Sequence, residues 1–123
     1  MTRDEVLAMK PGRELDALVM RNIFKAEKKD IGDDWYWCIE VDCVCECWPH
    51  WFSPSTDISA VFEAEEFAIE KDPAMYVHAL ASVVFGYSQV QDISDIRKMC
   101  MLIHATPEQR CKAALLAVMD GDE

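Results

Sequence analysis

Hydrophobic residues recur with a helical period in three long segments of the chain, at 12–27, 56–71 and 106–121. In the first segment the apolar side is carried by Leu15, Leu18, Val19 and Ile23. The predicted apolar side of the middle segment consists of Ile58, Val61, Phe62, Ala68 and Ile69. A short helix is predicted before all three, because Thr2 and Glu5 have the spacing of a capping box.

Alternating positions predict strands in the rest of the chain. In the stretch WYWCIEVDCVC, which begins at Trp35, one parity is largely apolar and is predicted to face the core. Pro49 and Pro54 prevent a central strand from continuing, so 48–55 is predicted to be an irregular aromatic loop. The segment 76–85 is predicted to be a strand because it is rich in β-branched and aromatic residues, and 98–104 is predicted to be a second strand. The two are expected to be antiparallel neighbours, since no helix has room between them.

The order of these elements predicts a single domain, residues 1–123, of the α+β class. We expect a small, mainly antiparallel β-sheet packed with helices. The chain is 51% hydrophobic, and a chain of 123 residues can bury a core without disulfides or metals.

The net charge indicates what kind of partner the protein can bind, and the cysteine content indicates in which cellular compartment it functions. Twelve basic and 23 acidic residues give a net charge of −11, which disfavours direct contact with nucleic-acid phosphates and favours a basic protein partner. No apolar run approaches the roughly 20 residues that cross a bilayer. The N-terminal sequence MTRDEVLAMKPG lacks the apolar core of a secretion signal, and six cysteines then fit a reducing compartment.

Three motifs follow one another along the chain: PGRELD at 11–16, STDI at 55–58 with Ala60 and Glu63, and CKAALLAV at 111–118. With them the sequence resembles the phage ABA sandwich domain family of small proteins encoded by tailed bacteriophages and prophages. The family patterns are PGRELD, YSTDI-A-AW-E and CRAALLAV. The resemblance implies a three-layer sandwich of the α/β/α type and a location in the host cytoplasm. It implies no activity and no site residues.

The sequence departs from the family pattern at several positions. Pro54 stands where the family tends to have Tyr, and Phe62 stands where Trp is usual. Many relatives carry a zinc-ribbon-like insert with paired CxxC spacing before the STDI motif. Here that place has no CxxC pair and holds Cys38, Cys43, Cys45, Cys47 and His50.

Four of these side chains are candidate zinc ligands, namely Cys43, Cys45, Cys47 and His50. Structural zinc is held by four convergent nitrogen or sulfur ligands. On one continuous strand the three cysteines would point the same way and spread apart instead of converging. Zinc is the one cofactor that the sequence suggests, and apolar or partly exposed free thiols are the alternative.

No catalytic signature is present, because the chain has no Gly-rich phosphate loop, no Ser-His-Asp pattern and no Walker motif. Cys111 lies near a predicted helix start, where the helix dipole lowers the pKa of a thiol, and His78 or His104 would have to be its base. Its position on an apolar helix stripe favours core packing instead. Both histidines are predicted to be half-buried strand residues. We therefore expect no enzyme.

Two surface features predict a binding function. Exposed aromatic residues in loops are preferred anchors, and the predicted anchors are Trp48, Trp51 and Phe52. One acidic ridge at helical spacing would attract a basic partner, and it consists of Glu63, Glu66 and Glu70. With the resemblance, they predict a phage protein that binds and modulates or inhibits a host protein. An anti-CRISPR-like inhibitor of a nucleic-acid-guided nuclease is one anti-defence example.

Two other functions stay open. A small-ligand-binding module that sequesters a nucleotide would need basic groups around a pocket, for which the candidates are Arg97, Lys98 and Arg110. A metal-dependent protein would use the cysteine and histidine cluster. A homodimer that pairs along the tryptophan-rich strand is compatible with all three functions.

Overall fold

The computed structural model describes residues 2–41, 44–86 and 96–121, and it confirms the α+β class with an antiparallel sheet. Its elements in chain order are α1 (Arg3–Ala8), α2 (Arg13–Asn22), β1 (Glu27–Ile31), β2 (Asp34–Val41), β3 (Val44–Pro49), α3 (Ile58–Lys71), α4 (Pro73–Phe85), α5 (Ile96–Ile103) and α6 (Pro107–Gly121). In the described ranges, every helix is too short or too polar to cross a membrane.

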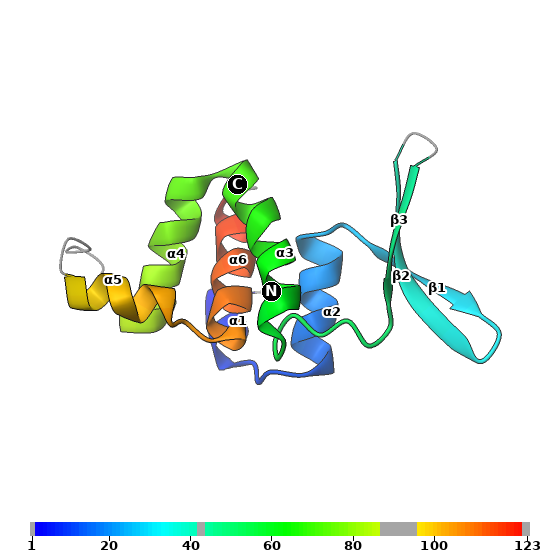
Figure 1. Ribbon diagram of the computed structural model, residues 1–123, viewed down its shortest axis with the longest axis horizontal. Coiled ribbons are helices and arrows are strands. Elements are labelled where there is room, and N and C mark those ends of the chain that lie inside the picture. The colour runs from blue at the N-terminus through cyan, green and yellow to red at the C-terminus, as the bar shows by residue number, and fades with distance from the viewer. Residues whose placement is uncertain (1, 42–43, 87–95, 122–123) are drawn as a thin grey trace.

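Helix α6 forms the centre of the helical part and contacts α1, α2, α3 and α4 (Figure 1). Every residue from Cys111 to Val118 is buried, so the helix is covered on all sides and not only along the predicted stripe. Alanines make this possible, because a small side chain lets a neighbouring backbone approach closely. The three alanines of this stretch, Ala113, Ala114 and Ala117, are all buried in the core.

A buried ion pair links α6 to α3. Arg110 Nη1 donates to Glu65 Oε1 at 2.6 Å, and both residues are only 9% exposed. The other guanidinium nitrogens donate to the backbone carbonyls of Ala105 at 2.9 Å and Ile103 at 2.7 Å. Because a buried charge is tolerated only when it is paired and hydrogen-bonded, Arg110 fixes α3, α6 and the α5–α6 connection to one another.

The predicted helix starts are confirmed by their caps. Thr2 Oγ1 accepts from the Glu5 amide at 3.2 Å at the start of α1. At α6, the Thr106 hydroxyl accepts from the Gln109 amide at 3.1 Å, and the Gln109 side chain accepts from the Thr106 amide at 2.9 Å. This reciprocal arrangement is a capping box, and it satisfies amides that the helix itself leaves unpaired.

The predicted apolar side of α3 is wrong in large part. Ile58, Phe62 and Ile69 are 41%, 48% and 43% exposed, whereas the buried positions are mostly alanines. The helix lies close against α6, and only small side chains fit between the two backbones. The buried residues of α3 are Ala60, Val61, Ala64, Glu65 and Ala68.

The two strands predicted at 76–85 and 98–104 are wrong, because these segments form most of α4 and α5. Asp72 ends α3, as expected, but its side chain also caps α4 by accepting from the Met75 amide at 3.1 Å, with Pro73 in the first turn. The β-branched and aromatic residues therefore lie on a helix, whose buried residues are Tyr76, Ala79, Leu80, Ala81 and Ser82. The cap at Asp72 and the packing of α4 against its neighbours therefore outweigh the strand propensity of these residues.

The single strand predicted from Trp35 to Cys45 is also wrong, because the chain folds back after Val41 into β3. Trp37 lies opposite Trp48, and Cys38 lies opposite Cys47. A further strand, β1, is not among the strands that the alternation predicts, and it pairs with β2. Gly32 has a φ of 67° at the first position of the two-residue loop between Ile31 and Asp34, a backbone conformation that favours glycine.

The sheet has the order β1-β2-β3 and lies at one end of the helical part, not between two helical layers (Figure 1). An aromatic contact centred on Phe24, which is 2% exposed, attaches it to the helices. The Phe24 ring lies 4.9 Å from Trp48 of β3 and 4.9 Å from Phe67 of α3. This arrangement leaves the face of the sheet that carries Trp35 and Trp37 beside α2.

Replacing Glu65 tests the ion pair. Glu65→Ala is expected to lower the free energy of unfolding by about 3–5 kcal/mol, because Arg110 would stay buried without its charge partner. Chemical denaturation measures the change. Glu66→Ala, at an exposed position of the same helix, is the matched control and is expected to change stability by less than about 0.5 kcal/mol. Equal, small effects would contradict the assigned role.

Candidate functional site

A pocket of about 470 Å³ lies where α2, the sheet and the segment after β3 meet. Its size is within the range of small-molecule sites in proteins. Helix α2 contributes Arg13, Asp16, Ala17 and Arg21; the sheet contributes Lys28, Trp35 and Trp37; the following segment contributes His50, Trp51, Phe52 and Ser53.

The sheet side of the pocket is aromatic. Trp35 and Trp37 lie on the same face of β2 because side chains alternate along a strand. Their rings are 5.3 Å apart and nearly perpendicular, and the His50 ring lies 5.7 Å from Trp35. Asp34 holds this histidine, since its Oδ1 lies 2.9 Å from His50 Nδ1 and also accepts from the Trp35 amide at 2.8 Å. The aromatic wall is thus positioned by ring contacts and by hydrogen bonds at the start of β2.

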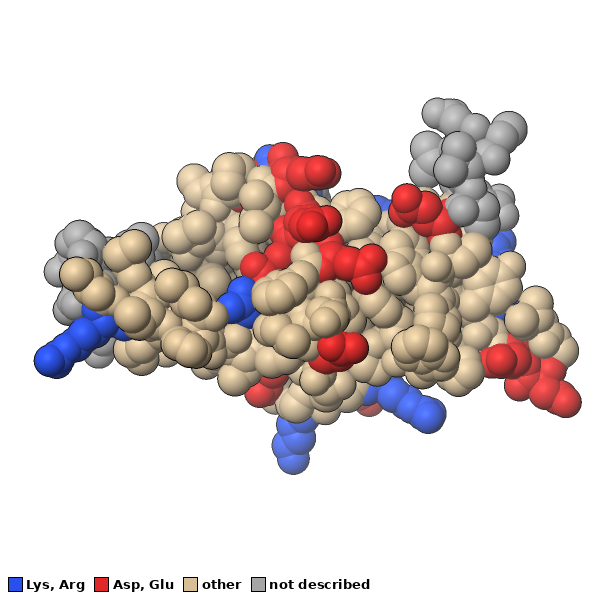
Figure 2. Space-filling model, viewed as in Figure 1, with Lys and Arg blue, Asp and Glu red and all other residues tan. Residues whose placement is uncertain are grey.

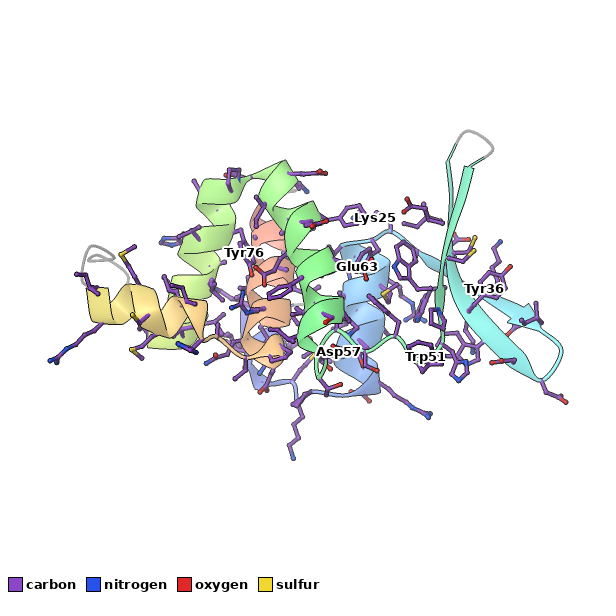
Figure 3. The ribbon with its side chains drawn as sticks, in the orientation of Figure 1. Lys25, Tyr36, Trp51, Asp57, Glu63 and Tyr76 are labelled. Atoms are coloured by element: carbon purple, nitrogen blue, oxygen red, sulfur yellow. The ribbon has the colours of Figure 1, made fainter. Side chains whose placement is uncertain are left out.

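The three predicted aromatic anchors have different environments. Trp51 is 71% exposed and lies between α2 and the sheet (Figure 3). Phe52 is half-buried, with its ring 6.0 Å from Phe24. Trp48 is part of β3 and only 9% exposed, so the prediction that it lies in a loop is wrong. Trp51 is therefore the anchor that is most open to a ligand.

Positive charge surrounds these rings, although the chain as a whole carries −11. Lys28 Nζ lies 4.8 Å from the centre of the Trp35 ring, and Arg21 Cζ lies 5.7 Å from that of Trp37, both within cation–π range. Arg13 is the third cation of the pocket lining. In the part of the chain that the structure describes, no carboxylate forms an ion pair with any of these three. They are available to an anionic group.

A buried contact between two distant motifs holds the pocket wall in place. The Ser55 amide donates to Asp16 Oδ1 at 2.8 Å, and the Ser55 hydroxyl accepts from the Gly12 amide at 2.9 Å. The segment that carries Trp51 is thereby tied to the start of α2. Burial raises the pKa of Asp16, and the hydrogen bonds from Ser55 oppose this shift.

The acidic ridge lies outside this pocket. Glu63, Glu66 and Glu70 are exposed on α3, and acidic side chains gather over this helix (Figure 2). Figure 3 labels Glu63 on α3 and Trp51 beside the sheet, with α2 between them in this view. The residues predicted as one partner-binding surface therefore form two, a ridge that is negative and an aromatic pocket whose rim is largely positive.

The four candidate zinc ligands are only partly described. Cys43 lies outside the described residues, and so does the side chain of Cys45. Cys47 and His50 are both exposed, but Cys47 lies on the sheet face of Cys38, whereas His50 contacts Trp35 on the opposite face. The structure does not bring these two together. Within the ranges that it covers, three or more metal-binding side chains gather nowhere.

Cys111 is a core residue, as its position on the apolar stripe predicted. It is fully buried, and burial together with the nearby carboxylates of Asp16 and Glu65 raises the pKa of its thiol. A raised pKa opposes formation of the nucleophilic thiolate. The prediction that His78 and His104 are half-buried strand residues is wrong, since both are exposed, one on α4 and the other just after α5.

Of the basic residues proposed for a ligand pocket, neither Arg97 nor Arg110 lines the pocket between α2 and the sheet. Arg110 is buried and committed to Glu65, whereas Arg97 is exposed on α5. Lys98 has a side chain outside the described part of the structure. The pocket uses Arg13, Arg21 and Lys28 instead, and sequence reasoning missed Lys28 because it predicts no strand at 27–31. The available signal was the pair Gly32-Asp33 between two short runs, which is typical of a hairpin loop.

Comparison of the chain with protein-family models, with curated proteins and with solved structures finds no match. The resemblance to the phage family thus stays a prediction, and the function is argued from the pocket itself.

Asp16 gives the pocket wall a dependence on pH. The pKa of Asp16 is raised in the folded chain, so the folded state holds this proton more tightly than the unfolded chain. The stability of the folded state therefore falls as pH rises above about 4, where the carboxyl of the unfolded chain is ionised. Asp16→Asn keeps an acceptor for the Ser55 amide and removes the charge. The variant is therefore expected to gain stability relative to the unmodified protein between pH 3 and pH 7.

Chemical denaturation across this range measures the difference. Asp33→Asn, at an exposed loop position, removes the same charge and shows how much of the change comes from net charge alone. A stability difference for Asp16→Asn that stays constant with pH, or falls as pH rises, would contradict the role of buried Asp16.

Proposed function

We propose that this chain is a binding module for a small anionic ligand and that the pocket between α2 and the sheet is its binding site. The observation that carries the proposal is the exposed Trp51 ring beside a concave aromatic wall with three cations. A tryptophan left in water forgoes about 1.5–3 kcal/mol that burial of a large apolar side chain provides. A ligand that covers the ring recovers this energy.

The lining also indicates the kind of ligand. Arg13, Arg21 and Lys28 favour a carboxylate, sulfonate or phosphate, and the rings of Trp35 and Trp51 favour a planar apolar group. The concave shape and the size of this site suit a small-molecule ligand better than the flat surface of a protein partner. The pocket lining offers aromatic and charged groups that can bind a ligand. The candidate nucleophile Cys111 is buried in the core and does not line the pocket. These features support binding as the mode of action.

Trp51 is the direct test of the site. Trp51→Ala is expected to weaken binding of the aromatic anion 8-anilinonaphthalene-1-sulfonate by about tenfold, because stacking on one aromatic side chain is worth about 1–3 kcal/mol. Fluorescence titration of the folded protein measures the affinity. Trp51→Phe keeps a ring and should retain most of the binding. The idea fails if the probe binds both variants and the unmodified protein equally.

A second candidate function rests on the exposed ridge of α3. Glu63, Glu66 and Glu70 present three carboxylates to solvent, which supports attraction to a basic surface of a host protein. This is the phage-encoded modulator or inhibitor expected from the sequence, in which the ridge would steer the partner and Trp51 would anchor it. An anti-CRISPR-like inhibitor of a nucleic-acid-guided nuclease belongs to this class.

Charge removal separates the two functions. A triple variant with Gln at positions 63, 66 and 70 should lose capture of its host partner from lysate at low salt, because the long-range attraction is gone. It should keep the affinity for the aromatic anion, since the ridge lies outside the pocket. Capture that is unchanged in the triple variant and in high salt would rule out the ridge as the attracting surface.

A further inference from the structure

The cations and the open ring of the pocket come from different elements. Arg13 and Arg21 belong to α2 and Lys28 to β1, whereas Trp51 follows β3. Trp37 is 4% exposed and the Arg21 guanidinium lies over its ring, so this part of the wall is already covered. A ligand would therefore place a flat group on Trp51 and an anionic group towards α2 and β1.

The number of cations favours a group with more than one negative charge. Three positive side chains line the pocket, and the acid beside them, Asp16, already accepts the Ser55 amide and has a raised pKa. A carboxylate or a sulfonate carries a single charge, whereas a phosphate monoester carries about −1.5 to −2 at neutral pH and three acceptor oxygens. Arginine side chains bind such oxygens in pairs.

The flat group is the second requirement. Nucleobases stack on tryptophan whatever their sequence, because every base presents a π face. A mononucleotide carries both the base and the phosphate monoester. A longer nucleic acid adds phosphates outside the pocket, where the net charge of −11 repels them.

We propose that the ligand of this pocket is a nucleoside monophosphate, with its base on Trp51 and its phosphate held by Arg21, Lys28 and Arg13. This inference rests on the proposed binding function and names its ligand class. The site differs from the basic residues predicted from the sequence, of which Arg110 is buried against Glu65.

The experiment is isothermal titration calorimetry of the whole chain with adenosine, guanosine, cytidine and uridine monophosphates, each compared with its nucleoside, with inorganic phosphate and with a single-stranded oligonucleotide. At least one monophosphate should bind about tenfold more tightly than its nucleoside or phosphate, because only the monophosphate combines stacking with charge-assisted contacts. The oligonucleotide should bind more weakly than the monophosphate.

Lys28→Ala should lower the affinity for the monophosphate about tenfold and leave the weak affinity for the nucleoside unchanged. Lys29→Ala is the matched control, since Lys29 is the next residue of β1, faces the other side of the sheet and does not line the pocket. Trp51→Ala should lower the affinity for both ligands.

Two outcomes would overturn the inference: no monophosphate binds more tightly than phosphate or its nucleoside, or Lys28→Ala and Lys29→Ala have the same effect. If the aromatic sulfonate still binds at Trp51 while every monophosphate fails, the binding module stands and only its ligand class is wrong. If neither class of anion binds, the proposed function fails as well.

Discussion

The helical part of this molecule depends on the burial of α6, and the contact that makes this burial specific is the ion pair between Arg110 and Glu65. Apolar side chains alone would let α3 slide along the alanine-rich surface of α6. The guanidinium removes that freedom, because it must reach one carboxylate and the carbonyls of Ala105 and Ile103 at the same time. Breaking such a pair is costly because it leaves a charge buried without a partner.

The sheet is attached to this helical part by aromatic rings, and the pocket is a consequence of that attachment. Phe24 contacts Trp48 and Phe67 and so brings the sheet against the end of α2 and α3. The contact between Ser55 and Asp16 then holds the segment after β3 against the start of α2. The exposed ring of Trp51 lies between these two attachments. The fold also separates the charges: Arg13, Arg21 and Lys28 line the aromatic pocket, whereas the exposed glutamates of α3 lie outside it.

Sequence reasoning succeeded where a local rule decides the outcome. The cap at Thr2 depends on residues three positions apart and forms as expected, and α6 lies in the segment where a helical period predicts it. It failed at 76–85, where β-branched residues suggested a strand but Asp72 and Pro73 start a helix that packs on α6.

The pocket could not be predicted for a related reason. Trp51 was recognised as an anchor because its loop setting is local, but Lys28 and Arg21 meet the rings only through strand pairing and the contact of α2 with the sheet. Such contacts join residues far apart in the chain, and alternation along one strand does not reveal where it turns back. The antiparallel pairing of β3 with β2 places Trp48 opposite Trp37 in the core, where a loop was expected.

The most direct measurement of the central claim is nuclear magnetic resonance of the four tryptophan indole N–H groups while the nucleoside monophosphate that binds most tightly in calorimetry is added. Single Trp→Phe variants assign the signals. The account predicts that the Trp51 and Trp35 signals shift in a saturable way and that the signal of Trp48, buried at the attachment of the sheet, stays in place. Unchanged indole signals, or a shift of Trp48 as large as that of Trp51, would contradict a nucleotide site in this pocket.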